Sequence, residues 1–255
     1  LERTTCNVWF ITDRKSVADG WNAMEWANIN DYTAEPDLWR RVGQAARLEC
    51  RSVIVTWIES HSHDHDIAAG YNTEWLRDGN DLADLAYPIS VRFPGAAFFV
   101  PNGPSPCKMN PAGREWFDID DRVNGPVAAA PVIDAAITAA LATLNLSASA
   151  LALAGFSQGG MMSLHCGLRH AAPSAAIVSF SGALLRHDDL GDGVNYPPVL
   201  LVHGTEDKVV PFALQSASYD VMQSRSIMVE TVACDGFGHG IDPDGLSAAI
   251  AFLAR

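Results

Sequence analysis

The chain is poor in charge, above all in basic residues. Only 18% of its 255 residues are charged, and 30 acidic residues outweigh 17 basic ones, so the formal net charge is −13. This balance argues against nucleic acid and against anionic membranes as partners. The first residues show no basic-then-apolar signal pattern, and no apolar run approaches the length of a membrane span. We therefore expect a cytoplasmic protein without stable membrane insertion.

Cysteine is scarce, and its spacing forms no recognised pair motif. The five cysteines form no C-x-x-C motif, and they stand at Cys6, Cys50, Cys107, Cys166 and Cys234. We expect most of them to be reduced and buried, although a disulfide is not excluded by their number.

Repeats, low-complexity tracts and linkers are also missing, and 48% of the residues are apolar, so we expect one domain over residues 1–255. Residues 1–76 are its atypical part and hold six of the seven tryptophans. Strands are predicted at 7–12, 52–58, 93–100, 150–156, 175–182 and 198–203 and within 224–232, and helices at 36–48, from 78, at 127–144, after 157 and at 243–254. Strands that alternate with helices predict an α/β fold with a mainly parallel sheet covered on both faces.

A Gly-x-Ser-x-Gly motif joins a predicted strand to a predicted helix. Its serine is Ser157, flanked by Gly155 and Gly159. This is the context of a nucleophile elbow, a turn so tight that larger side chains two residues before and after the serine would collide. We expect the Ser157 hydroxyl to be exposed above the sheet, with the Gln158 backbone N–H as an oxyanion donor. The alternative is a helix N-terminus with small residues for packing.

A serine hydroxyl needs a base and a group that orients the base. Asp207 follows a predicted strand, where α/β enzymes gather site residues, and His239 lies between two glycines in a later loop. The order serine, aspartate, histidine is that of α/β-hydrolases. Rivals for these roles are Glu206, expected to point away, and His203, which as the end of a buried strand is more typical of packing. His165 and His170 on the elbow helix are interpreted as structural.

The segment His61–Asp66 holds three histidines that alternate with other residues, two of them acids. Imidazole and carboxylate are zinc ligands, and the spacing is similar to the His-x-His-x-Asp-His box of metallo-β-lactamases with its last two residues transposed. The next histidine comes only at His165. We therefore interpret the segment as a solvated loop and expect no metal, while a metal-dependent hydrolase stays an alternative.

Several segments together resemble the bacterial carboxylesterase branch of the phospholipase/carboxylesterase family, to which acyl-protein thioesterases are related. The resemblance covers about residues 78–255 and rests on Asp78-Gly-Asn-Asp-Leu, Phe93-Pro-Gly-Ala-Ala-Phe, Gly113-Arg-Glu-Trp-Phe-Asp, Gly155-Phe-Ser-Gln-Gly, His203-Gly-Thr-Glu-Asp-Lys-Val-Val-Pro and Gly238-His-Gly-Ile-Asp. It implies an α/β-hydrolase fold without a large cap and hydrolysis of short- to medium-chain acyl esters, with no cofactor. A homodimer is an expectation from the resemblance alone.

The resemblance also implies roles for single residues. Ser157 would be the nucleophile, His239 the base and then the acid, and Asp207 the orienting carboxylate. Trp116 and Val209 match acyl-pocket positions; for both, the alternative is ordinary core.

One family motif is missing. The family carries Leu-His-Gly-x-Gly shortly before Asp-Gly-Asn-Asp-Leu, and this motif supplies one oxyanion N–H, but here 67–76 stands in its place. Loss of one oxyanion donor costs about 10²–10³ in rate. Either another N–H around 59–75 substitutes, or the enzyme is slow.

We therefore predict a serine carboxylesterase acting on small acyl esters. The alternatives are a thioesterase or lysophospholipase of the same mechanism, and a binding protein that kept the three residues but lost the oxyanion hole.

Overall fold

The structure of the protein is a computed structural model. It describes residues 52–57, 89, 92–93, 95–99, 103–108, 114–191 and 195–255. The elements predicted at 7–12, at 36–48 and from residue 78, and the segment His61–Asp66, lie outside the described residues.

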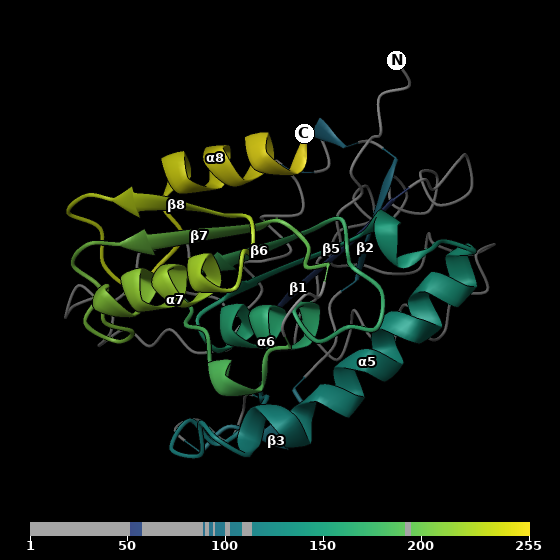
Figure 1. Cartoon of the computed structure of the whole chain (residues 1–255), viewed down its shortest axis with the longest axis horizontal. Helices are drawn as coiled ribbons and strands as arrows, with labels where there is room; N and C mark the ends of the chain where they lie inside the picture. Colours follow the sequence, from purple (N-terminus) through teal and green to yellow (C-terminus); the bar gives the residue numbers. More distant parts are fainter. Residues whose placement is uncertain are drawn as a thin grey trace, which may run out of the picture.

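A six-stranded parallel sheet forms the centre of the fold, in the order β2-β1-β5-β6-β7-β8 (Figure 1). Its strands are β1 (Ser52–Trp57), β2 (Ala96–Phe99), β5 (Leu151–Phe156), β6 (Ala176–Phe180), β7 (Val199–Gly204) and β8 (Val229–Cys234). The predicted strands at these places are confirmed, and so is the α/β fold. A separate antiparallel pair joins β3 (Ser105–Pro106) to β4 (Arg114–Glu115).

The helices that the described residues form are α5 (Gly125–Leu144), α6 (Gln158–Gly167), α7 (Ala213–Ser224) and α8 (Pro243–Leu253). Helices α6, α7 and α8 pack on the strands, and α5 packs on α6. Figure 1 shows α8 on one side of strands β7 and β8, and α6 and α7 on the other. Short 3₁₀ turns occupy Ala148–Ala150 and His187–Asp189. The central strands β5, β6 and β7 are buried along their whole length, which explains why they read as apolar runs without alternation.

Helix α7 was not predicted from the sequence. The residues that it buries are Gln215, Ser218 and Met222, so two of the three are polar. Their burial depends on partners elsewhere. The Gln215 amide donates to the carbonyl of Leu201 at 3.0 Å, and the Ser218 hydroxyl accepts from the N–H of Leu184 at 2.9 Å.

Helix α5 corrects the expectation on apolar runs, because by length and composition it could cross a membrane. Alanine dominates its sequence and Asp134 is its one charged residue. Its buried residues include Ile133 and Ile137, and the helix packs against α6. A helix that covers a core passes the same test, so one such helix is weak evidence for a membrane span.

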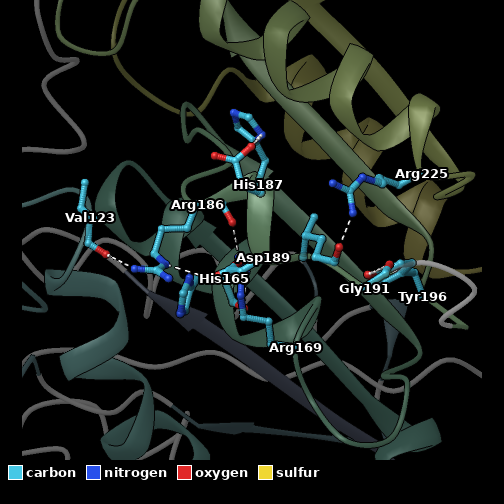
Figure 2. Close-up of polar contacts among 11 residues, drawn as sticks. Val123, His165, Arg169, Arg186, His187, Asp189, Gly191, Tyr196 and Arg225 are labelled. Carbon is cyan, nitrogen blue, oxygen red and sulfur yellow. Dashed lines mark hydrogen bonds and ion pairs between the residues drawn. The ribbon is translucent and has the colours of Figure 1, made fainter.

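An ion-pair cluster fastens the segment after β6 to the helices (Figure 2). Asp189 pairs with Arg169 in the turn after α6 and, at 2.8 Å, with Arg186, whose guanidinium also donates to the carbonyl of Val123 at 3.0 Å. Burial would raise the pKa of Asp189, but the hydrogen bonds and charges of the two arginines outweigh it and lower that pKa. The cluster therefore ties three parts of the chain together around one carboxylate.

Replacing this carboxylate should cost stability in a pH-dependent way. The pair is partly exposed, so we expect Asp189→Asn to cost only about 1 kcal/mol, or about 2–4 °C in Tm. A lowered pKa stabilises the fold above the unfolded pKa of about 3.9, and this gain is lost as pH falls. The Tm difference, measured by calorimetry, should therefore be present at pH 7 and shrink below about pH 4.

Asp188→Asn is the matched control, since the Asp188 side chain is 94% exposed and contacts the exposed His187. An equal loss of Tm in both variants would contradict the structural role of the cluster.

Candidate active site

The turn between β5 and α6 carries Ser157 and is held by close backbone contact. A Cβ on Gly155 would lie 2.3 Å from the backbone of Gly159, so no side chain fits at that position. Ser157 itself has φ 53° and ψ −123°, outside the helical and extended regions. Its N–H donates to the carbonyl of Phe180 at the end of β6, at 2.8 Å. The predicted nucleophile elbow is therefore present, and β6 holds its strained residue in place.

The Ser157 side chain differs from the expectation in one respect. We expected an exposed hydroxyl, but only 3% of Ser157 is exposed, and the whole of α6 behind it is buried. The imidazole of His239 lies against the serine, with its Nε2 atom 3.0 Å from the hydroxyl.

The structure brings Ser157, His239 and Asp207 together, although 82 residues separate the serine from the histidine. The Nε2 atom of His239 lies 3.0 Å from the Ser157 hydroxyl, and its Nδ1 atom lies 2.7 Å from Asp207 Oδ2. Because an ionised carboxylate only accepts, Nδ1 carries the proton and Nε2 is free to accept from the hydroxyl. The three groups thus form a continuous relay of the kind that can activate a serine hydroxyl.

Asp207 is kept ionised by hydrogen bonds. Its Oδ1 atom accepts from the N–H groups of Val209 and Val210, both at 2.9 Å. Burial would raise the pKa of Asp207, but hydrogen bonds from His203 and His239, together with that of Val210, hold the pKa well below its usual range. Asp207 therefore carries a negative charge at neutral pH.

The loop that carries His239 is fastened to the loop that carries Asp207. The N–H of Glu206 donates to the carbonyl of Phe237 at 2.9 Å, and Ser181 donates its hydroxyl to Gly240 at 3.4 Å. Gly204 permits this approach, since a Cβ there would lie 2.3 Å from the carbonyl oxygen of Phe237. These backbone contacts fix the imidazole relative to the carboxylate.

Gln158 follows the serine and is fully buried. Its side-chain oxygen accepts from the N–H of Trp116 at 2.7 Å, and its amide nitrogen donates to the carbonyl of Phe117 at 2.7 Å. Sequence analysis considered only the backbone of this residue and missed the bridge. The bridge fixes the first turn of α6, whose N-terminal N–H groups face the position of the serine. Residues 59–75, among which a substitute oxyanion donor was one of the two alternatives, lie outside the described residues.

The two predicted acyl-pocket residues lie in different surroundings. Trp116 is 3% exposed and belongs to the hydrophobic core, beside Gln158. Val209 is 52% exposed, so the alternative of ordinary core does not apply to it. Both lie next to residues of the site, through Gln158 and Asp207 respectively.

The rival residues take no place beside the serine. Glu206 is exposed, as expected, and His203 is packed at the end of β7. Burial and the charges of Arg169 and Arg186 lower the pKa of His165 to about 4, against the opposing charge of Asp189, so this histidine is neutral at neutral pH.

The described part of the chain bears on two expectations, those on metal binding and on the cysteines. Within it, no group of three or more His, Cys, Asp or Glu side chains could hold a metal ion. Cys107, Cys166 and Cys234 are free and buried, as expected, and burial raises the pKa of Cys234 to about 11. Cys6 and Cys50 lie outside the described residues.

Comparison with known proteins agrees with the geometry. The family described as Phospholipase/Carboxylesterase matches residues 78–255, the range over which the sequence carries the resemblance. A crystal structure of esterase PE8 is similar, with a TM-score of 0.69 and 35% identity over 80% of this chain and 92% of that one.

Two curated relatives differ in their coverage. Esterase YpfH of Escherichia coli K12 is 28% identical over 68% of this chain and 75% of its own length. Acyl-protein thioesterase 1 of Gibberella zeae is 32% identical over 41% of this chain, which spans only 47% of that relative.

Two glycine substitutions test the fastening of the loops. Gly204→Ala places a Cβ against the backbone of Phe237 and should displace His239. Because a displacement of about 1 Å can cost about 10²-fold, we expect the rate of Ser157 labelling by a fluorophosphonate to fall by about that factor.

Gly236→Ala serves as the control, because a Cβ there meets no heavy atom within 4 Å, although its φ of 68° is strained for alanine. We expect it to cost about 1 kcal/mol of stability and to leave labelling unchanged. Equal labelling of the two variants would show that the contact at Gly204 is unimportant for the site.

Proposed function

We propose that this chain, which belongs to the phospholipase/carboxylesterase family, is a serine carboxylesterase that hydrolyses short- to medium-chain acyl esters. The observation that carries the proposal is the continuous relay of Ser157, His239 and Asp207, with distances of 3.0 and 2.7 Å. The esterases among its relatives support hydrolysis of acyl esters as the reaction.

In the first half of the proposed reaction, the Ser157 oxygen attacks the ester carbonyl. His239 accepts the hydroxyl proton at Nε2, which leaves a positive imidazolium next to the Asp207 carboxylate. Collapse of the tetrahedral intermediate breaks the ester C–O bond, and His239 donates its proton to the leaving alcohol. The acyl group remains on Ser157.

In the second half, water attacks the acyl-enzyme and His239 takes a proton from this water. The carboxylic acid leaves, and the proton returns to the Ser157 oxygen. The intermediates of both halves carry negative charge on the former carbonyl oxygen. The backbone N–H of Gln158, at the start of α6, would donate to that oxygen. No cofactor takes part in these steps.

Hydrolysis of p-nitrophenyl esters from acetate to laurate tests the proposal directly. We expect Ser157→Ala to lower kcat/KM by at least about 10⁴-fold because the nucleophile is gone, while circular dichroism stays unchanged. A chelator should leave the wild-type rate unchanged.

Ester turnover by Ser157→Ala within a few-fold of wild type would overturn the serine mechanism. Turnover that a chelator abolishes and zinc restores would instead favour the segment His61–Asp66 as a metal centre. A folded wild type that reacts with a fluorophosphonate but turns over no ester would favour a binding protein.

A thioesterase is the second candidate, because several matched relatives are acyl-protein thioesterases. The same three residues would act on a thioester. A kcat/KM more than about tenfold higher for a butyryl thioester than for the matched oxygen ester would favour it. A cytoplasmic location and a homodimer stay predictions.

Chain-length preference tests the assignment of Val209. Its side chain is half exposed, whereas its backbone N–H supports Asp207, so a substitution changes the surface and leaves the support in place. We expect Val209→Phe to lower the ratio of kcat/KM for laurate to that for acetate by about tenfold, because the ring narrows the acyl site.

The matched control is Val132→Phe on α5, where the side chain is also exposed. The ratio should stay as in the wild type. An unchanged ratio in Val209→Phe would exclude Val209 from the acyl site.

A further inference from the structure

His203 lies in direct contact with the carboxylate of Asp207. It belongs to the end of β7, its side chain is 1% exposed, and its Nε2 atom lies 3.2 Å from Asp207 Oδ2. The same Nε2 atom lies 2.8 Å from the carbonyl oxygen of Val210. A carbonyl oxygen only accepts hydrogen bonds, so Nε2 must carry a proton. This single N–H is shared between the carbonyl and the carboxylate.

We propose that His203 is a positioning residue that holds the carboxylate of Asp207 in place and reduces its negative charge toward His239. The proposal rests on the proposed function, because it assigns His203 a role in the same relay.

The hydrogen bonds of Asp207 support a role in orientation. Its Oδ1 atom accepts two backbone N–H bonds from Val209 and Val210, and its Oδ2 atom faces two imidazoles, those of His239 and His203. Without His203, Oδ2 would keep one partner and the carboxylate would be freer to turn. A carboxylate that turns releases His239 from its alignment with Ser157.

His203 is itself well fixed. Its ring meets Phe212 edge-on with centroids 5.9 Å apart, and its hydrogen bond to Val210 closes the loop that carries Asp207 onto the strand. The residue is not a second base, because its Nε2 atom is a donor and it is His239 that contacts the serine.

The charges around Asp207 make the N–H of His203 important. Among the described residues, no lysine or arginine pairs with Asp207, and its compensation comes from N–H groups. Nearby charges point elsewhere: Glu206 and Lys208 are exposed, Asp235 accepts from Thr205 at 3.3 Å, and Asp242 caps α8. His203 from β7 and His239 from the loop before α8 are the titratable groups that face the carboxylate.

Removal of the His203 N–H should change the pH dependence of kcat/KM. A less compensated carboxylate binds the proton of His239 more tightly, and a carboxylate beside an apolar ring is harder to ionise. Both effects raise the pH at which His239 is neutral while Asp207 is ionised. The acid limb of kcat/KM therefore moves to higher pH.

The test compares His203→Phe with His203→Gln, using p-nitrophenyl butyrate from pH 5 to 9 and rates normalised to fluorophosphonate-titrated sites. For His203→Phe we expect an acid limb about 0.5–1 pH unit higher, kcat about tenfold lower and KM within about twofold. His203→Gln can place an amide N–H near the former Nε2 and should restore the wild-type limb.

His165→Phe is the control for the loss of a buried histidine, since His165 lies on α6 and makes no contact with the relay. Its acid limb should equal that of the wild type. Two results would overturn the positioning role: an acid limb of kcat/KM that does not move in His203→Phe, or a kcat that is lowered equally over the whole pH range. Either result would mean that His203 only packs.

A measurement on the wild type covers the case in which His203→Phe does not fold. Long-range ¹H–¹⁵N spectra at pH 8, assigned with His203→Gln, should show His203 as the Nε2–H tautomer. An Nδ1–H tautomer would overturn the proposal. Absence of ester turnover by the wild type would contradict the proposed function, and the tautomer would still report on His203.

Discussion

The close contact between Gly155 and Gly159 is the constraint on which the site depends. A Cβ on Gly155 would lie only 2.3 Å from the backbone of Gly159, so only glycine permits this sharp turn. The turn places Ser157 at φ 53°. A non-glycine residue in such a conformation is strained, and the strain is offset by the hydrogen bond from Ser157 to Phe180. Strand β6 therefore supports the serine as much as its own strand β5 does. Gly204 has the same role in the next loop of the site, because the backbone of Phe237 leaves no room there for a side chain.

The second requirement is a buried negative charge, which no lysine or arginine of the described residues accompanies. Isolated buried carboxylates are costly and become neutral unless hydrogen bonds favour the ionised form. Asp207 meets four N–H groups, two from the backbone and two from imidazoles. A lysine or arginine beside Asp207 would compete with the imidazolium that forms on His239 in the proposed reaction, whereas backbone and imidazole N–H groups support the carboxylate without such a permanent charge. In the proposed mechanism, the support of the acid is thus part of the activation of the serine.

The parallel sheet brings these requirements together in space. Ser157, Asp207 and the loop with His239 follow β5, β7 and β8, whose carboxyl ends lie at one edge because neighbouring strands run in parallel. Residues 82 positions apart in the chain then need only short loops to meet. The helices fix these loops from behind: the Gln158 side chain joins α6 to the segment with Trp116, and Asp242 caps α8 directly after the His239 loop.

The parallel sheet, the elbow and the juxtaposition of Ser157, Asp207 and His239 could all be predicted from the sequence. Buried strands need apolar runs, and a tight turn needs glycines at fixed spacing, so both leave a local trace. The tertiary structure decided what depends on distant partners. Helix α7 escaped detection because its buried Gln215 and Ser218 pair with other elements. The burial of Ser157 and the contact of His203 with Asp207 also arise only when the loops close, because a histidine at a strand end has the same local sequence whether it packs or orients a carboxylate.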